Sequence, residues 1–322
     1  MPIEEIYALA AEDMHGVNAL IRDRLCSEVA LINELGNYII AGGGKRLRPM
    51  LVLLSARAFG YLGSYHINLA AVVEFIHTAT LLHDDVVDGS ELRRGRKTAN
   101  NLWGNEASVL VGDFLYSRSF QMMVQVRNLR VMEILANATN TIAEGEVMQL
   151  VHCHDPETSE ARYLEVIRCK TAKLFEAAAE LGAVLAGCGT ASEQAMATYG
   201  RHLGTAFQLI DDVLDYSSSS EEMGKNVGDD LEEGKPTLPL IHTMRHGTPA
   251  QVAVVREAIL TGGRDNLHAV IEAIEATGAI AYTIRSAQEE SNKARTALQD
   301  LPRSSYRDAL EGLVEFSVNR HY

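Results

Sequence analysis

The sequence predicts an all-α protein that folds as a single domain over residues 1–322. Three observations support this prediction. The chain is 322 residues long and 47% hydrophobic, so it can bury a large core. Its Ala-, Leu- and Val-rich segments are rarely interrupted, because the chain contains only 7 prolines. No segment shows the alternation of strand and helix patterns that is typical of a parallel α/β fold.

Apolar residues recur at helical spacing along most of the chain, and short groups of Gly, Ser or Pro end each run. No Pro- or Ser-rich linker divides the chain. The pattern predicts helices over residues 4–17, 18–40, 46–61, 67–88, 105–126, 128–152, 160–188, 191–217, 237–246, 249–261, 265–299 and 303–319.

Composition excludes several classes of protein. The formal net charge of −14 argues against a nucleic-acid partner, which needs an excess of basic surface. The four cysteines have no CxxC spacing and fit reduced thiols. The first residues do not resemble a signal peptide, and no run of about 18 apolar residues predicts a membrane span. We therefore expect a cytoplasmic protein without a transmembrane segment, for which transient contact with a membrane stays open.

Two copies of one acidic pattern, Asp-Asp-x-x-Asp, occur at 84–88 and 211–215. In a helix the first and last aspartates of each copy share one face, so their like charges need a cation between them. Carboxylate oxygens without Cys or His favour Mg²⁺, which usually binds one or two carboxylates together with phosphates. The copies lie 127 residues apart (211 minus 84), which suits two helices facing each other across a cavity. A solvated acidic helix end is the minor alternative.

An acidic protein that binds a diphosphate must gather basic side chains locally. The segment Gly-Gly-Gly-Lys-Arg-Leu-Arg-Pro at 42–49 ends one predicted helix and begins the next. Its glycines let a ligand approach the backbone, and Lys45 and Arg48 can point at one phosphate. The alternative is a glycine helix stop followed by a basic turn, although cations at a helix N-terminus oppose its dipole. His77 lies two turns before Asp84 and is either a phosphate donor or a packed core histidine.

The residues after the first motif form a basic turn. Adjacent side chains point in different directions, so Arg93 and Arg94 are expected to serve two different anions. Lys170 and Thr171 lie inside a predicted helix, where an isolated lysine is ordinarily a surface residue.

The Gly-rich, charged segment 224–240 follows the second motif and carries Lys225 and Lys235. Its composition is not helical. It is typical of a mobile flap that closes over a charged substrate.

These motifs, in this order, resemble the all-trans polyprenyl diphosphate synthases over essentially the whole chain. Within that family the chain is most similar to the bacterial octaprenyl diphosphate synthases. No catalytic position departs from the family pattern. The resemblance implies an all-α isoprenoid synthase bundle around a deep central cavity, and a homodimer. It rests on GGGKRLRP, EFIHTATLLHDDVVD, RRG, NEASVLVGDFLYSRSFQMM, AEGEVMQL, KTAKLFEAAAELG, GTAFQLIDDVLDY and GKNVGDDLEEGKPTLPL.

The resemblance also implies the site residues and the reaction, in which isopentenyl diphosphate is added repeatedly to an allylic diphosphate. The diphosphate of isopentenyl diphosphate would be held by Lys45, Arg48, His77 and Arg94. That of the allylic primer, such as farnesyl diphosphate, would be held by Arg93, Lys170, Thr171, Gln208, Lys225 and Lys235. Two or three Mg²⁺ ions would be ligated by Asp84, Asp88 and Asp211, with the two metal shells completed or oriented by Asp85, Asp212 and Asp215. These six aspartates and Lys170 are the predicted catalytic residues.

Product length is expected to depend on the helix that carries the first motif. Ala79 and Thr80 lie about one turn before Asp84 and are small. The resemblance implies that bulky aromatic residues at these positions stop growth early in short-chain relatives, so the tunnel should stay open past the first few isoprene units. Met122, Met123 and Leu135 are candidates for its floor, of which Met123 is the first choice, although all three are also ordinary core residues.

Other classes remain open from the sequence. Shorter or longer products, geranylgeranyl or nonaprenyl diphosphate, are the alternatives within the family, and a non-catalytic regulatory subunit is a further one. A terpene cyclase would ordinarily have another second metal motif and more aromatic residues than 6%. A di-iron bundle is suggested by Glu74-x-x-His77, but it leaves both aspartate motifs unexplained.

Overall fold

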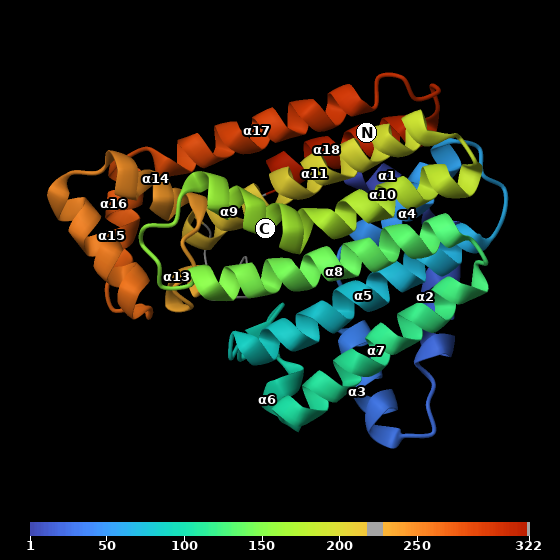
Figure 1. Ribbon diagram of the computed structural model, residues 1–322, viewed down its shortest axis with the longest axis horizontal. Coiled ribbons are helices and arrows are strands. Elements are labelled where there is room, and N and C mark those ends of the chain that lie inside the picture. Colours follow the sequence, from blue (N-terminus) through green and yellow to red (C-terminus); the bar gives the residue numbers. More distant parts are fainter. Residues whose placement is uncertain (218–227, 321–322) are drawn as a thin grey trace. The chain divides into compact units, whose positions relative to one another are not determined.

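The computed structural model describes residues 1–217 and 228–320, apart from the side chain of Ala41, and most of this part is helical (Figure 1). Its strands are β1 (Leu92–Arg93) and β2 (Arg96–Lys97), which form one antiparallel hairpin. The all-α prediction is therefore confirmed.

The helices follow the chain in this order: α1 (Ile3–Leu9), α2 (Ala11–Leu25), α3 (Ala30–Ala41), α4 (Leu47–Ala58), α5 (Tyr65–Val87), α6 (Ala99–Trp103), α7 (Asn105–Gln125), α8 (Leu129–His152), α9 (Glu160–Ile167), the π-helical turn η1 (Arg168–Ala172), α10 (Lys173–Ala186), α11 (Thr190–Ser217), α13 (Asp229–Glu232), α14 (Leu238–His246), α15 (Pro249–Thr261), α16 (Leu267–Ala276), α17 (Ala279–Ala297) and α18 (Ser305–Asn319).

The chain divides into two compact units, each of which is assembled from separate segments. Unit 1 contains residues 1–139, 174–200 and 297–313. Unit 2 contains residues 140–173, 201–296 and 314–322. The first aspartate motif belongs to unit 1 and the second to unit 2. The expected single domain stays a prediction.

The core of unit 1 is built around α4, α5 and α7. Met50, Leu51 and Val52 of α4 are fully buried, and α5 has an almost continuous run of buried residues from Leu69 to Ile76. α5 and α7 lie side by side (Figure 1). Burial of the central part of α5 fixes the helix that carries the first motif.

Unit 2 has a core in which α14, α15 and α16 pack together (Figure 1). Leu240, Val255 and Ile274 are buried in it and touch Tyr216, the residue that follows the second motif. A second cluster packs Tyr163 of α9 and Leu238 of α14 against α11. The second motif is thus held by apolar contacts on both sides of its helix.

Four predicted helices, 4–17, 18–40, 160–188 and 265–299, differ from the structure. The predicted break at 17/18 does not occur, and the chain instead turns at Ala10 and between α2 and α3. There Ser27 and Asn33 exchange hydrogen bonds, with the Ser27 N–H donating to Asn33 Oδ1 (3.0 Å) and Asn33 Nδ2 donating to the Ser27 carbonyl (2.7 Å). Such side-chain bonds compete with helical backbone bonds. The predicted helix 160–188 contains the π-helical turn η1.

The predicted helix 265–299 is divided into α16 and α17, which are bent by 65°. Gly278, at the break, has φ +68°, the left-handed conformation that commonly ends a helix at glycine. No single described helix is long and apolar enough to span a membrane, while this bent pair meets the length and composition criteria when taken together. In the part of the chain that the structure describes, none of the four cysteines forms a disulfide.

A buried ion pair joins α11 to α17 and should make stability depend on pH. Glu290 bonds to His202 (2.5 Å) and to Lys293 (2.8 Å). Burial alone would raise the pKa of Glu290, but these two partners outweigh it and lower the pKa from 4.5 to about 2. A depressed carboxyl pKa stabilises the folded state above the unfolded pKa, and this contribution is lost as pH falls from about 4.5 towards 2.

Glu290→Gln should therefore lower the free energy of unfolding at pH 7 by on the order of 3 kcal/mol, and the difference should shrink as pH falls below about 4.5. Urea unfolding at pH 7, 5 and 4 measures this. The exposed neighbour Glu289 is the control, since Glu289→Gln should change little at any pH. A Glu290→Gln difference that stays constant down to pH 3.5 would contradict the role of the ion pair.

Candidate active site

The first motif lies at the end of α5, where burial separates its aspartates. Asp84 and Asp88 are partly exposed, whereas Asp85 is buried. Burial raises the pKa of Asp85, and the charge of Arg93 opposes this shift. Arg93 donates to Asp85 Oδ1 from Nε (2.7 Å) and from a terminal nitrogen (2.6 Å). Arg93, predicted to hold the allylic diphosphate, is therefore anchored to the middle aspartate.

The basic turn after the motif is a two-residue β-hairpin, which the helix-based prediction missed. Arg93 pairs with Arg96 across the strands, and Arg94 and Gly95 form the turn. Both turn residues have positive φ, 54° and 71°, as a type I′ turn requires. The Arg-Gly dipeptide was the available sequence signal. In the hairpin Arg93 bonds to Asp85 and Arg94 bonds to the carbonyl of Gly43, so the two arginines have different partners. That they serve two different anions stays a prediction.

The glycine-rich segment before α4 approaches Arg94 closely. A Cβ built on Gly44, whose φ is +142°, would lie 2.5 Å from a guanidinium nitrogen of Arg94. A larger residue at this position would have to displace the end of the Arg94 side chain, and the φ of +142° is one that other residues rarely adopt. The predicted break is confirmed, since α3 ends at Ala41 and α4 begins at Leu47. Lys45 is exposed beside it, and its carbonyl accepts a bond from the Tyr7 hydroxyl (2.8 Å).

His77 lies among four arginines of unit 1. Burial holds the pKa of His77 well below its usual value, and the charges of the arginines lower it further; they are Arg48, Arg94, Arg93 and Arg46. Arg48 lies 3.2 Å from His77 Nε2 and stacks over the ring of Phe175 (4.4 Å). Because arginine only donates, Nε2 accepts and the proton of the neutral ring lies on Nδ1. A neutral histidine surrounded by guanidinium groups suits a multiply charged anion.

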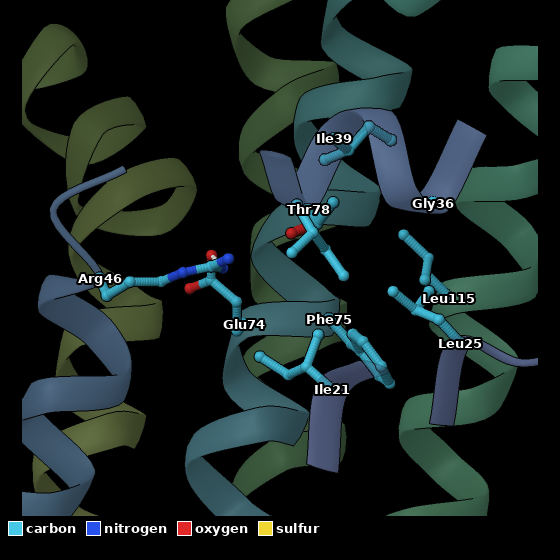
Figure 2. Close-up of a pocket in the computed structure, with 10 residues that line it drawn as sticks. Ile21, Leu25, Gly36, Ile39, Arg46, Glu74, Phe75, Thr78 and Leu115 are labelled. Atoms are coloured by element: carbon cyan, nitrogen blue, oxygen red, sulfur yellow. Dashed lines mark hydrogen bonds and ion pairs between the residues drawn. The ribbon is translucent and has the colours of Figure 1, made fainter. Parts of the chain in front are cut away.

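A narrow apolar pocket in unit 1 borders this arginine group. Figure 2 shows Arg46 and Glu74 facing each other at one side of the pocket, opposite Leu25 and Leu115. Arg46 has the left-handed φ of 48°, and its ion pair with Glu74 is largely buried. Glu74 is thus committed to an arginine, which removes it from the di-iron site that Glu74-x-x-His77 suggested.

The second motif lies on α11, and each of its aspartates has a different partner. Asp211 is 41% exposed and pairs with Arg320, which follows α18 (2.6 Å). Asp212 is buried and accepts bonds from Gln208 Nε2 (3.0 Å) and from the hydroxyl of Tyr163. Burial, with a contribution from Asp230, raises the pKa of Asp212 to about 8. Asp215 is buried and accepts from the Asp230 N–H (3.2 Å).

The π-helical turn η1 presents the predicted residues Lys170 and Thr171. Lys170 pairs with Glu146 (2.5 Å) and donates to Gln149 (2.7 Å), while Thr171 donates to Gln208 Oε1 (3.0 Å). Gln208 in turn bonds to the second motif, so Thr171 is connected to it. π-Helical turns are rare in proteins as a whole, but many of those that occur lie at functional sites.

The same turn needs a glycine on the neighbouring helix α8. A Cβ on Gly145 would lie 2.7 Å from the backbone nitrogen of Lys170, so only glycine lets α8 approach η1 this closely. Gly145 and the bonding partners Glu146 and Gln149 come from one helical turn of α8. This turn therefore positions Lys170.

The predicted flap is described only from Gly228 onward, and Lys225 lies outside the described residues. Lys235 is largely buried, and it forms an ion pair with Glu233. Its backbone N–H donates to the Asp230 carbonyl (2.8 Å). The described part contains the short helix α13, which the sequence did not predict.

The predicted chain-length residues all belong to unit 1. Ala79, Met123 and Leu135 are fully buried, and Thr80 is partly buried with its hydroxyl bonded to the His77 carbonyl (2.8 Å). None of the four lines the pocket of Figure 2. Their role in product length stays a prediction.

The donor chemistry of both motifs fits Mg²⁺. Within residues 1–217 and 228–320, no group of three His, Cys, Asp or Glu side chains is arranged to hold an ion. Mg²⁺ ordinarily takes one or two carboxylates and completes its shell with water and phosphate oxygens, so partly exposed Asp84 and Asp211 are suitable ligands.

The fold and both motifs are those of an all-α isoprenoid synthase. Residues 29–277 match the family model described as polyprenyl synthetase. The octaprenyl diphosphate synthase of Escherichia coli (strain K12) is 56% identical over 321 residues, which cover 99% of each chain. The all-trans-nonaprenyl-diphosphate synthase (geranyl-diphosphate specific) of Rhodobacter capsulatus is 45% identical, over 98% of each chain.

A solved structure is also closely similar. It is the polyprenyl synthase of Caulobacter crescentus CB15 complexed with calcium and isoprenyl diphosphate, with a TM-score of 0.96 and 48% identity. The match covers 99% of this chain and 98% of the other. The chain belongs to the polyprenyl synthetase family.

Proposed function

We propose that this protein is a long-chain all-trans polyprenyl diphosphate synthase that makes octaprenyl diphosphate. The observation that carries the proposal is the 56% identity, over nearly the whole chain, to an octaprenyl diphosphate synthase, with both aspartate motifs present. Identity to the nonaprenyl enzyme is lower, at 45%. The product would supply the side chain of a respiratory quinone. The homodimer and the cytoplasmic location stay predictions.

The arginine group around His77 supports binding of isopentenyl diphosphate. Arg48 and Arg94 provide charged donors there, and exposed Lys45 adds a third cation at the start of α4. Neutral His77 can donate from Nδ1 to a phosphate oxygen without adding charge. The bond to the Gly43 carbonyl and the hairpin keep Arg94 in place before substrate arrives.

The allylic primer would bind to Arg93, Lys170, Thr171, Gln208, Lys225 and Lys235. Asp84, Asp88 and Asp211 would hold two or three Mg²⁺ ions with its diphosphate, and the related synthase bound to calcium and isoprenyl diphosphate supports this. When bound, the ions would supply positive charge that stabilises the diphosphate leaving group. Asp85 and Asp212, held by Arg93 and by Tyr163 with Gln208, would orient the motifs.

The reaction breaks the allylic C–O bond, and diphosphate leaves with the electron pair. The isopentenyl double bond then attacks the allylic carbon, and a proton is lost. The basic residues hold the leaving diphosphate in place and stabilise its charge. We infer that the departing diphosphate accepts the proton, since the residues assigned here to the primer are cationic or neutral.

One assay tests the function. The purified protein is incubated with isopentenyl diphosphate, farnesyl diphosphate and Mg²⁺; diphosphate release is followed and the product is sized by chromatography. An eight-unit product is expected. Products of four or nine units would instead favour the geranylgeranyl or nonaprenyl alternative, and no diphosphate release would favour a regulatory subunit.

The two adjacent arginines should affect different substrates. Arg93→Ala should chiefly raise KM for the allylic primer, and Arg94→Ala that for isopentenyl diphosphate. Each loses charge-assisted bonds worth about 1.5 to 3 kcal/mol, or roughly ten- to hundredfold. Arg96, in the same hairpin, stacks on Tyr38 (4.1 Å), so Arg96→Ala is the control and should leave both KM values nearly unchanged. Equal effects of Arg93→Ala and Arg94→Ala on both substrates would show that the assignment is wrong.

A further inference from the structure

Arg320 forms an ion pair with one carboxylate oxygen of Asp211, a proposed metal ligand. Its guanidinium lies 2.6 Å from Asp211 Oδ1, and the side chain is only 5% exposed. The sequence motifs gave no indication of this contact, because Arg320 follows the last helix and lies 109 residues from Asp211 (320 minus 211). Both residues belong to unit 2.

The guanidinium is held by more than its ion pair. It stacks on the ring of Phe207, 3.6 Å from the centroid, and donates to the Phe207 carbonyl (2.6 Å). Phe207 lies one helical turn before Asp211, so one face of α11 supplies a ring, a carbonyl and a carboxylate. These three groups together bind the Arg320 guanidinium. A solvated surface ion pair, in contrast, contributes little to stability.

In its contact with Asp211, Arg320 also leaves one hydrogen-bond donor without an acceptor in the described part of the chain. Arg320 Nε is buried and has no hydrogen-bond partner among residues 1–217 and 228–320. A buried donor without a partner costs free energy, which makes it easier for the guanidinium to move when a ligand arrives.

The two motifs place their arginines differently. In unit 1, Arg93 bonds to buried Asp85, the middle residue of its motif. In unit 2, Arg320 bonds to Asp211, the first residue, which we assign as a metal ligand. A divalent cation that approached Asp211 alone would be repelled by Arg320, whereas a cation that arrives with diphosphate brings compensating negative charge.

We propose that Arg320 is the resting counter-ion of Asp211 and makes metal binding at the second motif dependent on a bound diphosphate. This inference rests on the proposed function for the identity of the ligands. Arg320 is a positioning residue, since it acts through Asp211 and not on the reacting atoms.

Metal titration tests the proposal without turnover. The parent is the full chain with Asp84→Asn and Asp88→Asn, which silences the first motif. Mn²⁺ binding to it is followed by electron paramagnetic resonance, with and without inorganic diphosphate. Adding Arg320→Gln should tighten Mn²⁺ binding at least tenfold without diphosphate, and the difference should fall below threefold with diphosphate present.

Two variants control for charge and for general effects. Arg320→Lys keeps a cation and should bind Mn²⁺ as the parent does. Arg256→Gln removes an exposed arginine of the same unit that pairs with Glu157 (2.5 Å), and it should change nothing. If Arg320→Gln does not fold, as judged by circular dichroism, Arg320→Met replaces it and keeps an apolar contact with Phe207.

If Arg320→Gln, or Arg320→Met in its place, leaves Mn²⁺ binding without diphosphate unchanged or weaker, the proposal is overturned. A tenfold gain that persists with diphosphate would overturn the coupling. Neither result depends on prenyl transfer, so the product assay of the intact enzyme can fail while this titration succeeds, and the reverse also holds.

Discussion

Asp84→Ala or Asp211→Ala should reduce condensation by on the order of 10³-fold or more. Each change removes a carboxylate that we assign to Mg²⁺, and positive charge at the leaving diphosphate is the largest source of stabilisation available to such a site. Initial rates at saturating Mg²⁺ and both substrates measure the effect. Asp23, a 73% exposed aspartate on α2, is the control, because Asp23→Ala should leave the rate nearly unchanged.

Stability distinguishes a metal ligand from a structural aspartate. Asp84 lies near two other carboxylates, so Asp84→Ala relieves repulsion and should leave the unfolding temperature nearly unchanged. Asp85→Ala, in contrast, leaves Arg93 without its buried partner and should lower stability as well as activity. Near-normal turnover of Asp84→Ala at saturating Mg²⁺ would contradict the metal assignment.

Helical periodicity predicted most of the helices because burial of apolar side chains decides where these helices form. α5, α7 and α8 have nearly the expected limits, since long apolar faces are visible in the sequence. The failures share another cause. Ser27 and Asn33 end a helix through side-chain bonds, and the hairpin at Arg94 and Gly95 depends on left-handed backbone conformations. Neither feature changes the spacing of apolar residues.

The part of the candidate site that could be predicted from the sequence consists of residues whose expected role follows from their own charge. Arg93 and Arg94 were expected to serve different anions because they are adjacent. The structure gives them different partners, Asp85 and the Gly43 carbonyl, and their anions stay a prediction. The partners of these groups were not predictable, since Tyr163 and Arg320 reach the second motif from α9 and from the segment after α18. Such contacts depend on how distant segments pack, and no local pattern records them.

Product length should depend on volume at Ala79. Ala79 lies about one turn before Asp84 on α5 and is fully buried, so a tyrosine ring there must enter the proposed tunnel or displace packed neighbours. Ala79→Tyr should therefore stop growth at about three to five isoprene units, at a cost in stability of about 1 to 3 kcal/mol. Ala79→Ser, which keeps the side chain small, is the control and should give the parental length.

Met123→Ala should have the opposite effect if Met123 forms the floor of the tunnel. Met122 provides a matched comparison, because both methionines are fully buried neighbours on α7 whose side chains leave the helix in different directions. Each change to alanine should destabilise the protein by about 2 to 5 kcal/mol through the cavity it leaves. Only Met123→Ala should lengthen the product, because only that cavity would extend the tunnel. Chromatography of the products decides: a product no longer than the parental one from Met123→Ala would assign Met123 to the core, and the floor would then be tested at Leu135. A parental chain length from Ala79→Tyr would show that the growing chain does not pass this face of α5.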